Sequence, residues 1–250
     1  MPPSLAAAAF SFDCYGTLID WETGIIAAVR AWLGGRCSDL DDEAILAAHA
    51  RLEPAAESAE PGARYPDVLA DVLRGLGAEL GVAVTDAEAR TFGASVGDWP
   101  AFPDSPAALA RLATGSRLII LSNVDRASFA RSEARLGVRF DAIVTAEDVG
   151  SYKPDPRNFE ALLAAAAGLR IPPGGLVHVA QSLYHDHVPA KAIGLPTVWI
   201  DRRAGRSGSG ATPTTSGEIR PDWTFGSLAA FADAVERARG AVAAAGDAEG

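Results

Sequence analysis

The sequence is short of cysteine and of basic residues, and both shortages restrict what the protein can be. Its 250 residues include only two cysteines, Cys14 and Cys37, too few for a disulfide framework or a cysteine-based metal site. Lysine and arginine together number 22 against 32 acidic residues, which gives a formal net charge of −10. Binding a nucleic-acid backbone needs a basic face, so we expect no nucleic-acid partner.

Long apolar runs are missing as well. No run approaches the roughly 20 residues needed to span a bilayer, so we expect no membrane partner. The first ten residues lack a basic segment ahead of an apolar one, so we expect no signal peptide. With so few cysteines, the chain is typical of a reducing compartment, and we expect a cytoplasmic protein.

What the sequence does contain is a short apolar segment, residues 7–12, that ends abruptly in Asp13. An apolar run of this length bounded by turn residues predicts a buried strand. A glycine turn and a hydroxyl residue, Thr17, follow. Ligands of an open parallel sheet bind just beyond the carboxyl ends of its strands, which makes Asp13 a candidate nucleophile near the backbone N–H groups of Cys14 and Tyr15. The alternative is an aspartate that only caps its own turn.

Residues 21–100 have a helical pattern. Apolar residues recur at three- and four-residue spacing over residues 25–33 and again over residues 65–80. A helical insertion directly after the nucleophile strand can cover an active site as a lid. We therefore expect residues 21–100 to form a helical cap, and residues 1–20 and 101–250 to form the core.

Beyond residue 100, predicted strands and helices alternate regularly, which implies a parallel sheet. The predicted strands lie at 117–121, 142–145, 176–180, 197–200 and 223–225. The predicted helices lie at 105–113, 126–136, 156–169, 186–194 and 228–242. The expected fold class is therefore α/β, a Rossmann-like parallel sheet with an inserted helical cap domain.

Polar and charged residues follow the predicted strands at the edge where Asp13 would lie. In chain order they are Ser122, Asn123, Lys153, Gln181, Ser182 and Asp186. The carboxyl ends of parallel strands share one edge of a sheet, so these side chains can converge. A lysine beside Asp13 would keep the carboxylate ionised and hold it by charge-assisted hydrogen bonds. Taken singly, each has a simpler alternative as a helix cap, a turn residue or a surface lysine.

The order and chemistry of these segments resemble the four motifs of the haloacid dehalogenase superfamily, over about residues 6–235. Its first motif is Asp-x-Asp-x-Thr, in which the first Asp is the nucleophile. Tyr15 replaces the second Asp here, and Asp-x-Tyr-Gly-Thr is typical of the 2-haloacid dehalogenase branch. Phosphate-transferring members carry Gly-Asp-x-x-x-x-Asp in the fourth motif, where Gln181 replaces the first acid. Two acids needed for Mg²⁺-dependent phosphoryl transfer are thus absent, and we expect a site with no metal and no cofactor.

The resemblance implies a two-step hydrolase. Asp13 would displace halide from a small 2-halo acid and form an ester, which water would hydrolyse to the 2-hydroxy acid with inverted configuration. Lys153 would orient Asp13. Thr17 and Ser122 would hydrogen-bond the nucleophile and the substrate carboxylate. Asp186 would orient the water or balance the charge of Lys153.

The resemblance also implies substrate-binding residues, among them Asn123 facing the leaving halide and two tyrosines that exclude water. The candidates are Cys14, Tyr15, Asn123, Arg51, Tyr65, Gln181 and Ser182. Characterised members place an arginine over the leaving halide, but Ala48 occupies that register here. Arg51, one helical turn away, and Arg64 are the nearest alternatives. The leaving group is therefore open, and a strained ring nitrogen is compatible with the same nucleophile.

The four histidines have no predicted role. We expect His185 and His187 on a loop or at the surface rather than as ligands, and His49 and His178 in the core or at the surface. The expected partner is a small anionic organic acid, and the resemblance allows a homodimer through the cap.

Two other functions stay open. A Mg²⁺-dependent small-molecule phosphatase would have to hold its metal with Asp13 and Asp186 alone, and chelator-sensitive turnover of a phosphate ester would favour it. A catalytically silent binding protein of the same fold would keep its biological role in Asp13→Asn.

Overall fold

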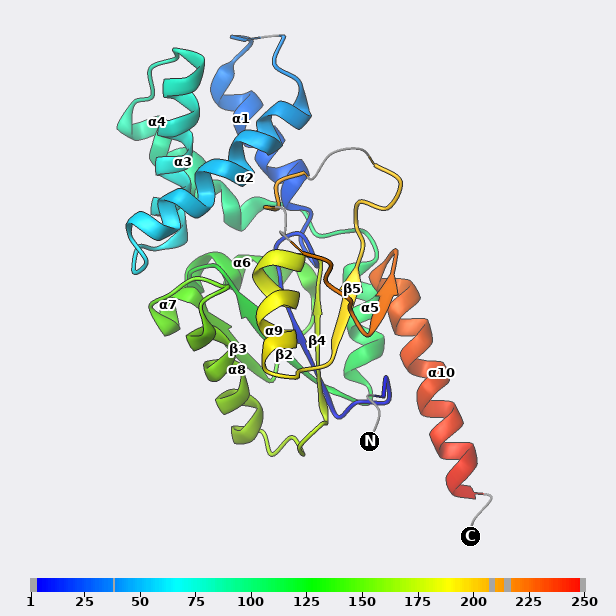
Figure 1. Ribbon diagram of the computed structural model, residues 1–250. Coiled ribbons are helices and arrows are strands. Elements are labelled where there is room, and N and C mark those ends of the chain that lie inside the picture. Colours follow the sequence, from blue (N-terminus) through cyan, green and yellow to red (C-terminus); the bar gives the residue numbers. More distant parts are fainter. Residues whose placement is uncertain (1–3, 38, 207–209, 214–216, 248–250) are drawn as a thin grey trace.

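The computed structural model describes residues 4–37, 39–206, 210–213 and 217–247. Within these residues, six strands form one parallel sheet in the order β3-β2-β1-β4-β5-β6 (Figure 1). This is the strand order of a doubly wound Rossmann sheet. The strands are β1 (Ala9–Phe12), β2 (Arg117–Ser122), β3 (Ala142–Thr145), β4 (Leu176–Ala180), β5 (Thr197–Ile200) and β6 (Trp223–Phe225). The expected fold class is confirmed.

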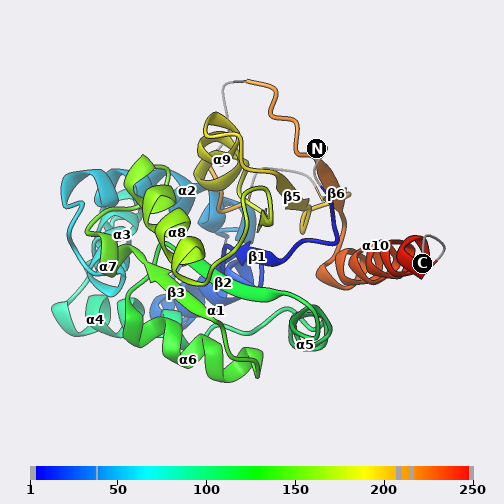
Figure 2. The same cartoon turned by 90° about the horizontal axis from the view of Figure 1, so that it is seen from below.

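Helices cover both faces of the sheet, and Figure 2 shows α5 and α6 on one face and α8 and α9 on the other. Successive strand residues point to opposite faces, so each strand supplies both layers. Phe10 and Ile120 pack in the cluster that includes α5, α6 and α10, whereas Ile119 and Leu121 pack against α8. The core helices are α5 (Ser105–Ala113), α6 (Arg126–Leu136), α7 (Ala146–Val149), α8 (Pro156–Gly168), α9 (Val188–Ala192) and α10 (Leu228–Asp247). Burial on both faces explains why the central strands are apolar almost without interruption.

A group of helices lies beyond the carboxyl ends of the strands, at the top of Figure 1. They are α1 (Trp21–Leu33), α2 (Asp42–Ala59), α3 (Tyr65–Leu80), α4 (Asp86–Ala94) and the short 3₁₀ turn η1 (Ser95–Asp98). The chain leaves the core and returns to it side by side, since Ile19 bridges Ala101. The Asp20 carboxylate caps α1 by accepting from Thr23 N, so this helix starts directly at the exit from the core.

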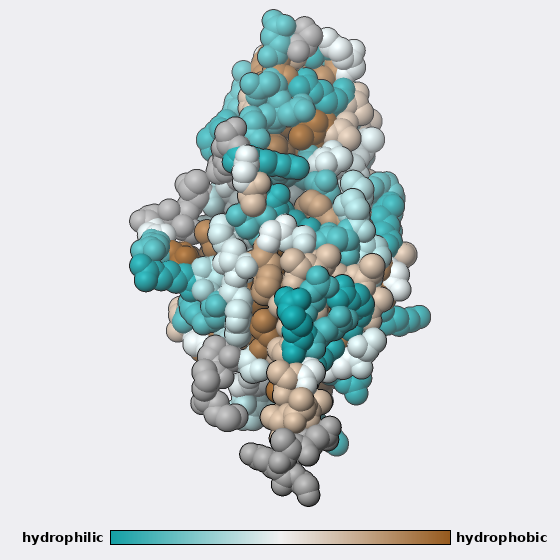
Figure 3. All heavy atoms as spheres, turned by 90° about the vertical axis from the view of Figure 1, so that its right-hand side faces the viewer, coloured by the Kyte–Doolittle hydropathy of each residue, from teal (hydrophilic) through white to brown (hydrophobic). Residues whose placement is uncertain are grey.

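Polar side chains dominate the visible surface of the cap and the core alike (Figure 3). None of the helices in the described part of the chain is long and apolar enough to cross a membrane.

One predicted helix starts earlier than expected. The helix predicted over 186–194 begins instead with a π-helical turn, η2 (Leu183–His187), and continues as α9. The turn is wide because the N–H group of His187 reaches back five residues to the carbonyl of Ser182, at 3.3 Å. Hydrophobic periodicity does not signal a π turn, and this one directs two histidines inward, as described below.

Candidate active site

The candidate site lies where β1, β2 and β4 end beneath the cap. It contains a small cavity of about 30 Å³. Nine predicted site residues line it: Asp13, Tyr15, Tyr65, Ser122, Asn123, Lys153, Gln181, Ser182 and Asp186. The sheet therefore brings together residues that lie more than 170 positions apart in the sequence, as the shared strand edge predicts.

Asp13 is held at both carboxylate oxygens. Thr17 Oγ1 donates to one at 2.6 Å, and Lys153 Nζ donates to the other at 2.9 Å. Thr17 is itself fixed, because its hydroxyl accepts from the N–H of Gln181 at 2.9 Å. Burial raises the pKa of Asp13, and the Lys153 cation opposes that rise by favouring the charged form. The result is an immobilised, buried carboxylate that lines the small cavity.

Lys153 uses all of its donors within the protein. Its Nζ donates to Asp13, to Asp186 Oδ1 at 2.7 Å and to the carbonyl of Leu121 at 3.0 Å. An ammonium group has three N–H bonds, so none is left over. Burial alone would lower the pKa of this lysine, but the two carboxylates raise it above its ordinary value. Asn123 aligns the lysine segment, since its amide accepts from Lys153 N and donates to Lys153 O.

A buried chain of hydrogen bonds supports Asp186 from behind. His178 Nε2 lies 2.9 Å from Asp186 Oδ1, and His178 Nδ1 lies 2.9 Å from Ser11 Oγ. The carboxylate can only accept, so Nε2 carries the ring proton and Nδ1 accepts from Ser11. Burial raises the pKa of Asp186, but Lys153 and His178 outweigh it and hold the pKa well below its usual range. Asp186 therefore stays ionised and balances the lysine.

The cap contributes acids rather than bases. Glu53 of α2 lines the cavity and accepts a hydrogen bond from Tyr65, while His49 Nε2 lies 3.4 Å from it. Burial raises the pKa of Glu53, but His49, His185 and the hydrogen bond from Tyr65 together outweigh burial, and the net pKa lies below the ordinary value. One turn further along α2, Glu57 accepts from Asn123 Nδ2 at 3.4 Å, and burial together with repulsion from Glu53 raises its pKa well above normal, against the opposing charge of Lys153.

Comparison with known proteins identifies the family. A family profile described as haloacid dehalogenase-like hydrolase matches residues 7–179. The chain belongs to this family of hydrolases.

The hydrolase is 31% identical over 211 residues to (S)-2-haloacid dehalogenase H-109 of Pseudomonas putida, covering 81% of this chain and 90% of that protein. It is 32% identical over 140 residues to an (S)-2-haloacid dehalogenase of Pseudomonas sp. strain YL, covering 55% of each. The crystal structure of the L-2-haloacid dehalogenase PA0810 superposes with a TM-score of 0.71 at 25% identity, covering 91% of this chain and 98% of that one. The predicted resemblance is thus confirmed.

Three predicted residues lie outside the cavity of the hydrolase. Cys14 is buried beneath the site, where its carbonyl accepts from the turn and burial raises the pKa of its thiol. Thr17 lies behind Asp13. Arg51 has a 58% exposed side chain on the outer face of α2, paired with Glu79, and Arg64 is 57% exposed beside Asp67. The helix turns Glu53 inward and Arg51 outward, and neither Arg51 nor Arg64 lines the cavity at Asp13.

Three residues that line the cavity were not predicted: Trp21, Glu53 and His185. The expectation that His185 and His187 lie on a loop or at the surface is wrong, because the π turn buries both. His178 lies in the core, bonded to Asp186. The sequence did contain a signal for His178, because Ser11 and His178 are both polar residues inside otherwise apolar strands. In the structure, the two residues pair in register on neighbouring strands.

The groups around Asp13 do not form a suitable set of ligands for a magnesium ion. Lys153 Nζ occupies the position between Asp13 and Asp186 where a shared cation would need to lie. Across the described residues, no group of three or more His, Cys, Asp or Glu side chains is arranged to hold a metal. Lys153 balances the charge of the two carboxylates in place of a metal ion.

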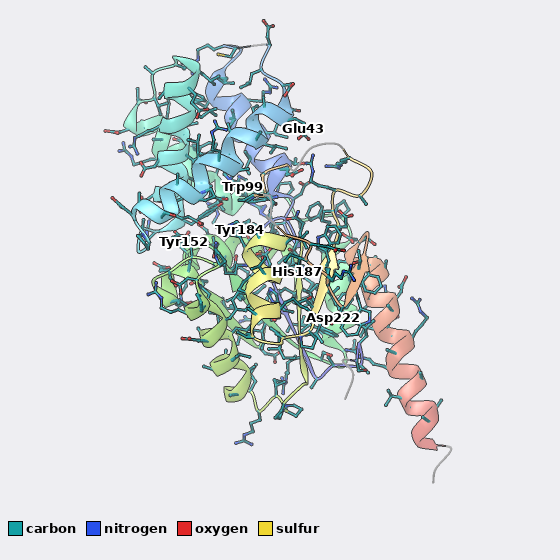
Figure 4. The ribbon with its side chains drawn as sticks, in the orientation of Figure 1. Glu43, Trp99, Tyr152, Tyr184, His187 and Asp222 are labelled. Atoms are coloured by element: carbon teal, nitrogen blue, oxygen red, sulfur yellow. The ribbon has the colours of Figure 1, made fainter. Side chains whose placement is uncertain are left out.

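Figure 4 shows Tyr152 at the junction of core and cap, where its hydroxyl donates to the carbonyl of Ala63 at 2.8 Å.

Proposed function

We propose that this hydrolase cleaves the bond between the α-carbon of a small 2-substituted carboxylic acid and its leaving group, a halide. The observation that carries the proposal is the buried Asp13 carboxylate at a strand end, held by Lys153 on one oxygen and by Thr17 on the other. The names of the two Pseudomonas relatives, both (S)-2-haloacid dehalogenases, support the same substrate class. The product is the 2-hydroxy acid of inverted configuration.

In the first step, one oxygen of Asp13 attacks the α-carbon from the side opposite the halogen. The new oxygen–carbon bond forms as the carbon–halogen bond breaks, and the halide leaves with the bonding electron pair. The cavity excludes bulk water, so the carboxylate has lost the hydration that weakens it as a nucleophile. Lys153 holds it in line, which removes the entropy cost of orienting it.

In the second step, water attacks the carbonyl carbon of the Asp13 ester. The acyl carbon–oxygen bond breaks, and the departing oxygen of the 2-hydroxy acid takes a proton that originates from the water. Asp186 lines the same cavity, and its Oδ2 is buried with no hydrogen-bond partner among the described residues, so this oxygen is the group that orients the water. The N–H groups of Cys14 and Tyr15 stabilise the oxyanion.

Ser122 binds the substrate carboxylate. Its Oγ lines the cavity and is buried with no partner in the part of the chain that the structure describes. A buried hydroxyl without a partner is costly, and a bound carboxylate relieves that cost. Gln181 and Ser182 line the adjoining wall.

The cap completes the site in this proposal. Residues 21–100 act as a cap domain on a core of residues 1–20 and 101–250. The ring centroids of Tyr15 and Tyr65 lie 6.4 Å apart, so core and cap together form an aromatic wall that keeps water out. Cytoplasmic location and a homodimer stay predictions.

The test is halide release from a panel of 2-fluoro, 2-chloro and 2-bromo acids by wild type and Asp13→Asn, each with and without EDTA. We expect release by wild type that EDTA does not affect and that the variant lacks. Turnover in water labelled with heavy oxygen should place the label in Asp13, detected by mass spectrometry of the peptide.

Two results would overturn the proposal. Label that enters the product without ever entering Asp13 would indicate direct attack by water. Release of no halide, together with EDTA-sensitive hydrolysis of a phosphate ester, would favour the phosphatase instead.

A further inference from the structure

The halide side of the cavity lacks a free cation. Among the described residues that line it, Lys153 is the only lysine or arginine, and its three N–H bonds go to Asp13, Asp186 and the Leu121 carbonyl. The cap adds Glu53, which is an acid. A departing anion therefore needs a different hydrogen-bond donor, because charge alone makes this pocket unfavourable for it.

His185 has a ring nitrogen available for this purpose. Its side chain is buried and lines the cavity together with Asp13. Its Nε2 has no hydrogen-bond partner within the residues that the structure describes. Buried polar nitrogens of folded proteins are nearly always paired, so an unpaired one in a cavity beside a nucleophile indicates a place for a ligand atom.

The other side of the ring determines which nitrogen carries the proton. His185 Nδ1 lies 3.2 Å from Ser182 Oγ, and that same oxygen accepts from the backbone N–H of His185 at 3.0 Å. The serine hydroxyl proton is then free to be donated to Nδ1. With Nδ1 as an acceptor, the neutral ring carries its proton on Nε2, the nitrogen without a partner.

We infer that His185 is a further catalytic residue, whose Nε2–H donates a hydrogen bond to the departing atom of the substrate as the bond to the α-carbon breaks. This inference rests on the proposed function, because it assigns the leaving-group contact of that reaction. Electrons balance without proton transfer: the halide leaves as an anion with the bonding pair, and the imidazole keeps its proton.

The surroundings keep the ring neutral. His185 is faced by Glu53 from the cap, by Asp186 and Lys153 from the core, and by the ring of Tyr184 at a centroid distance of 4.9 Å. Burial lowers its pKa most strongly, and the two acids only partly oppose this. Near neutral pH the ring is therefore an uncharged donor.

A neutral donor in a small cavity favours a particular class of leaving group. Hydrogen bonding strengthens as the accepting atom becomes smaller and its charge more concentrated. The preferred substrates are therefore 2-substituted acids with a compact, strongly accepting leaving atom, fluoride before chloride and chloride before bromide, relative to their intrinsic reactivity. An arginine would bind all three by charge and discriminate less.

The first experiment compares fluoride, chloride and bromide release from the three 2-halopropionates by wild type, His185→Gln and His185→Leu. Glutamine keeps an N–H donor, whereas leucine keeps only bulk. We expect His185→Leu to lose fluoride release by roughly 100-fold or more, as when one preorganised donor is removed, with a smaller loss for bromide and an intermediate result for His185→Gln. Tyr184→Phe is the matched control on the same turn and should keep the wild-type ratios.

Equal losses for all three halides in a His185→Leu protein that unfolds at the wild-type temperature would overturn the inference. So would unchanged fluoride release. If wild type releases no halide at all, the proposed function fails by itself, and a second experiment still tests His185.

That experiment adds sodium fluoride to resting wild-type protein carrying nitrogen-labelled histidine, with sodium bromide as the comparison. We expect the Nε2 resonance of His185 to shift with fluoride more than with bromide, and the other three histidines to stay unchanged. A His185 resonance that does not respond to fluoride would overturn the inference independently of any turnover.

Discussion

The two walls of one cavity are built on opposite electrostatic principles. On the core wall, Asp13 and Asp186 share the buried cation of Lys153, with donor–acceptor distances of 2.9 and 2.7 Å. On the cap wall, Glu53 accepts from Tyr65 and lies 3.4 Å from His49 Nε2. One turn further along α2 and outside the cavity lining, the buried Glu57 lies 3.4 Å from Asn123 Nδ2. Among the described residues, neither acid forms an ion pair with a lysine or arginine. The core wall therefore holds two carboxylates against one buried cation, whereas on the cap side the pKa of Glu53 lies below its ordinary value and the pKa of the neighbouring Glu57 lies well above it.

The difference indicates that the core wall and the cap wall have different roles. Reaction at Asp13 needs one ionised carboxylate in one position, and a buried lysine supplies both the charge and the position. The predictions below test whether the two walls differ in this way, and they run from the largest expected effect to the smallest.

Asp13→Asn removes the nucleophile of the core wall and should lower turnover by roughly 10³-fold or more, because loss of a nucleophile leaves only binding and polarisation. The measurement is halide release under saturating substrate. Its thermal midpoint should fall, since asparagine can accept from only one of Thr17 and Lys153, but the protein should still fold because Asp186 continues to pair with Lys153. Turnover within tenfold of wild type would contradict a covalent role.

Lys153→Met leaves two buried carboxylates without their cation and should cost about 3–5 kcal/mol of unfolding free energy. Urea unfolding measures it. The chain offers a matched control, because its only other lysine, Lys191, pairs with Asp222 at 2.9 Å nearer the surface. Lys191→Met should cost no more than about 1 kcal/mol. Equal costs for the two variants would show that the core wall has no special dependence on its cation.

His178→Phe removes the donor behind Asp186 while keeping a ring of similar size, and should cost about 1–3 kcal/mol because a buried acceptor loses its partner. Turnover should fall as well, and substrate affinity should change little, because His178 acts through Asp186 rather than on the substrate. Separate measurement of kcat and KM checks this. A change confined to KM would contradict a positioning role.

Glu57→Gln should make the protein more stable at neutral pH, on the order of 1 kcal/mol. The pKa of folded Glu57 lies above the ordinary 4.5, so the folded state holds this proton more tightly than the unfolded state does. Wild-type stability should therefore fall as pH rises from about 4.5 through the folded pKa, and the variant should lack that decrease. Urea midpoints across this pH range are the measurement, and identical pH profiles for the two proteins would contradict the assignment.

Arg51→Ala should have the smallest effect. Its pair with Glu79 is exposed, with side chains 58% and 41% accessible, so the cost should stay below about 1 kcal/mol. Halide release should be unchanged, because the guanidinium lies on the outer face of α2. A loss of turnover specific to this variant would place an arginine in the cap wall after all.

Most of the core wall was predictable from the sequence. Asp13, Ser122, Lys153 and Asp186 each end or follow an apolar strand, and parallel strands place such residues at one edge whatever the details of packing. The residues that form the cap wall were harder to predict. Helical periodicity indicates which residues are apolar, but Glu53 and Arg51 are both polar, and only packing determines which one is turned inward.

The sequence by itself determined the α/β class, the family and the position of Asp13 at a strand end, because strand-end chemistry and strand alternation are local patterns. The tertiary structure decided that His178 supports Asp186 and that an acid, rather than an arginine, closes the cavity. It also decided that a π turn brings His185 into the site. These features depend on backbone geometry and on contacts between distant segments, and such contacts form only when the cap is packed on the sheet.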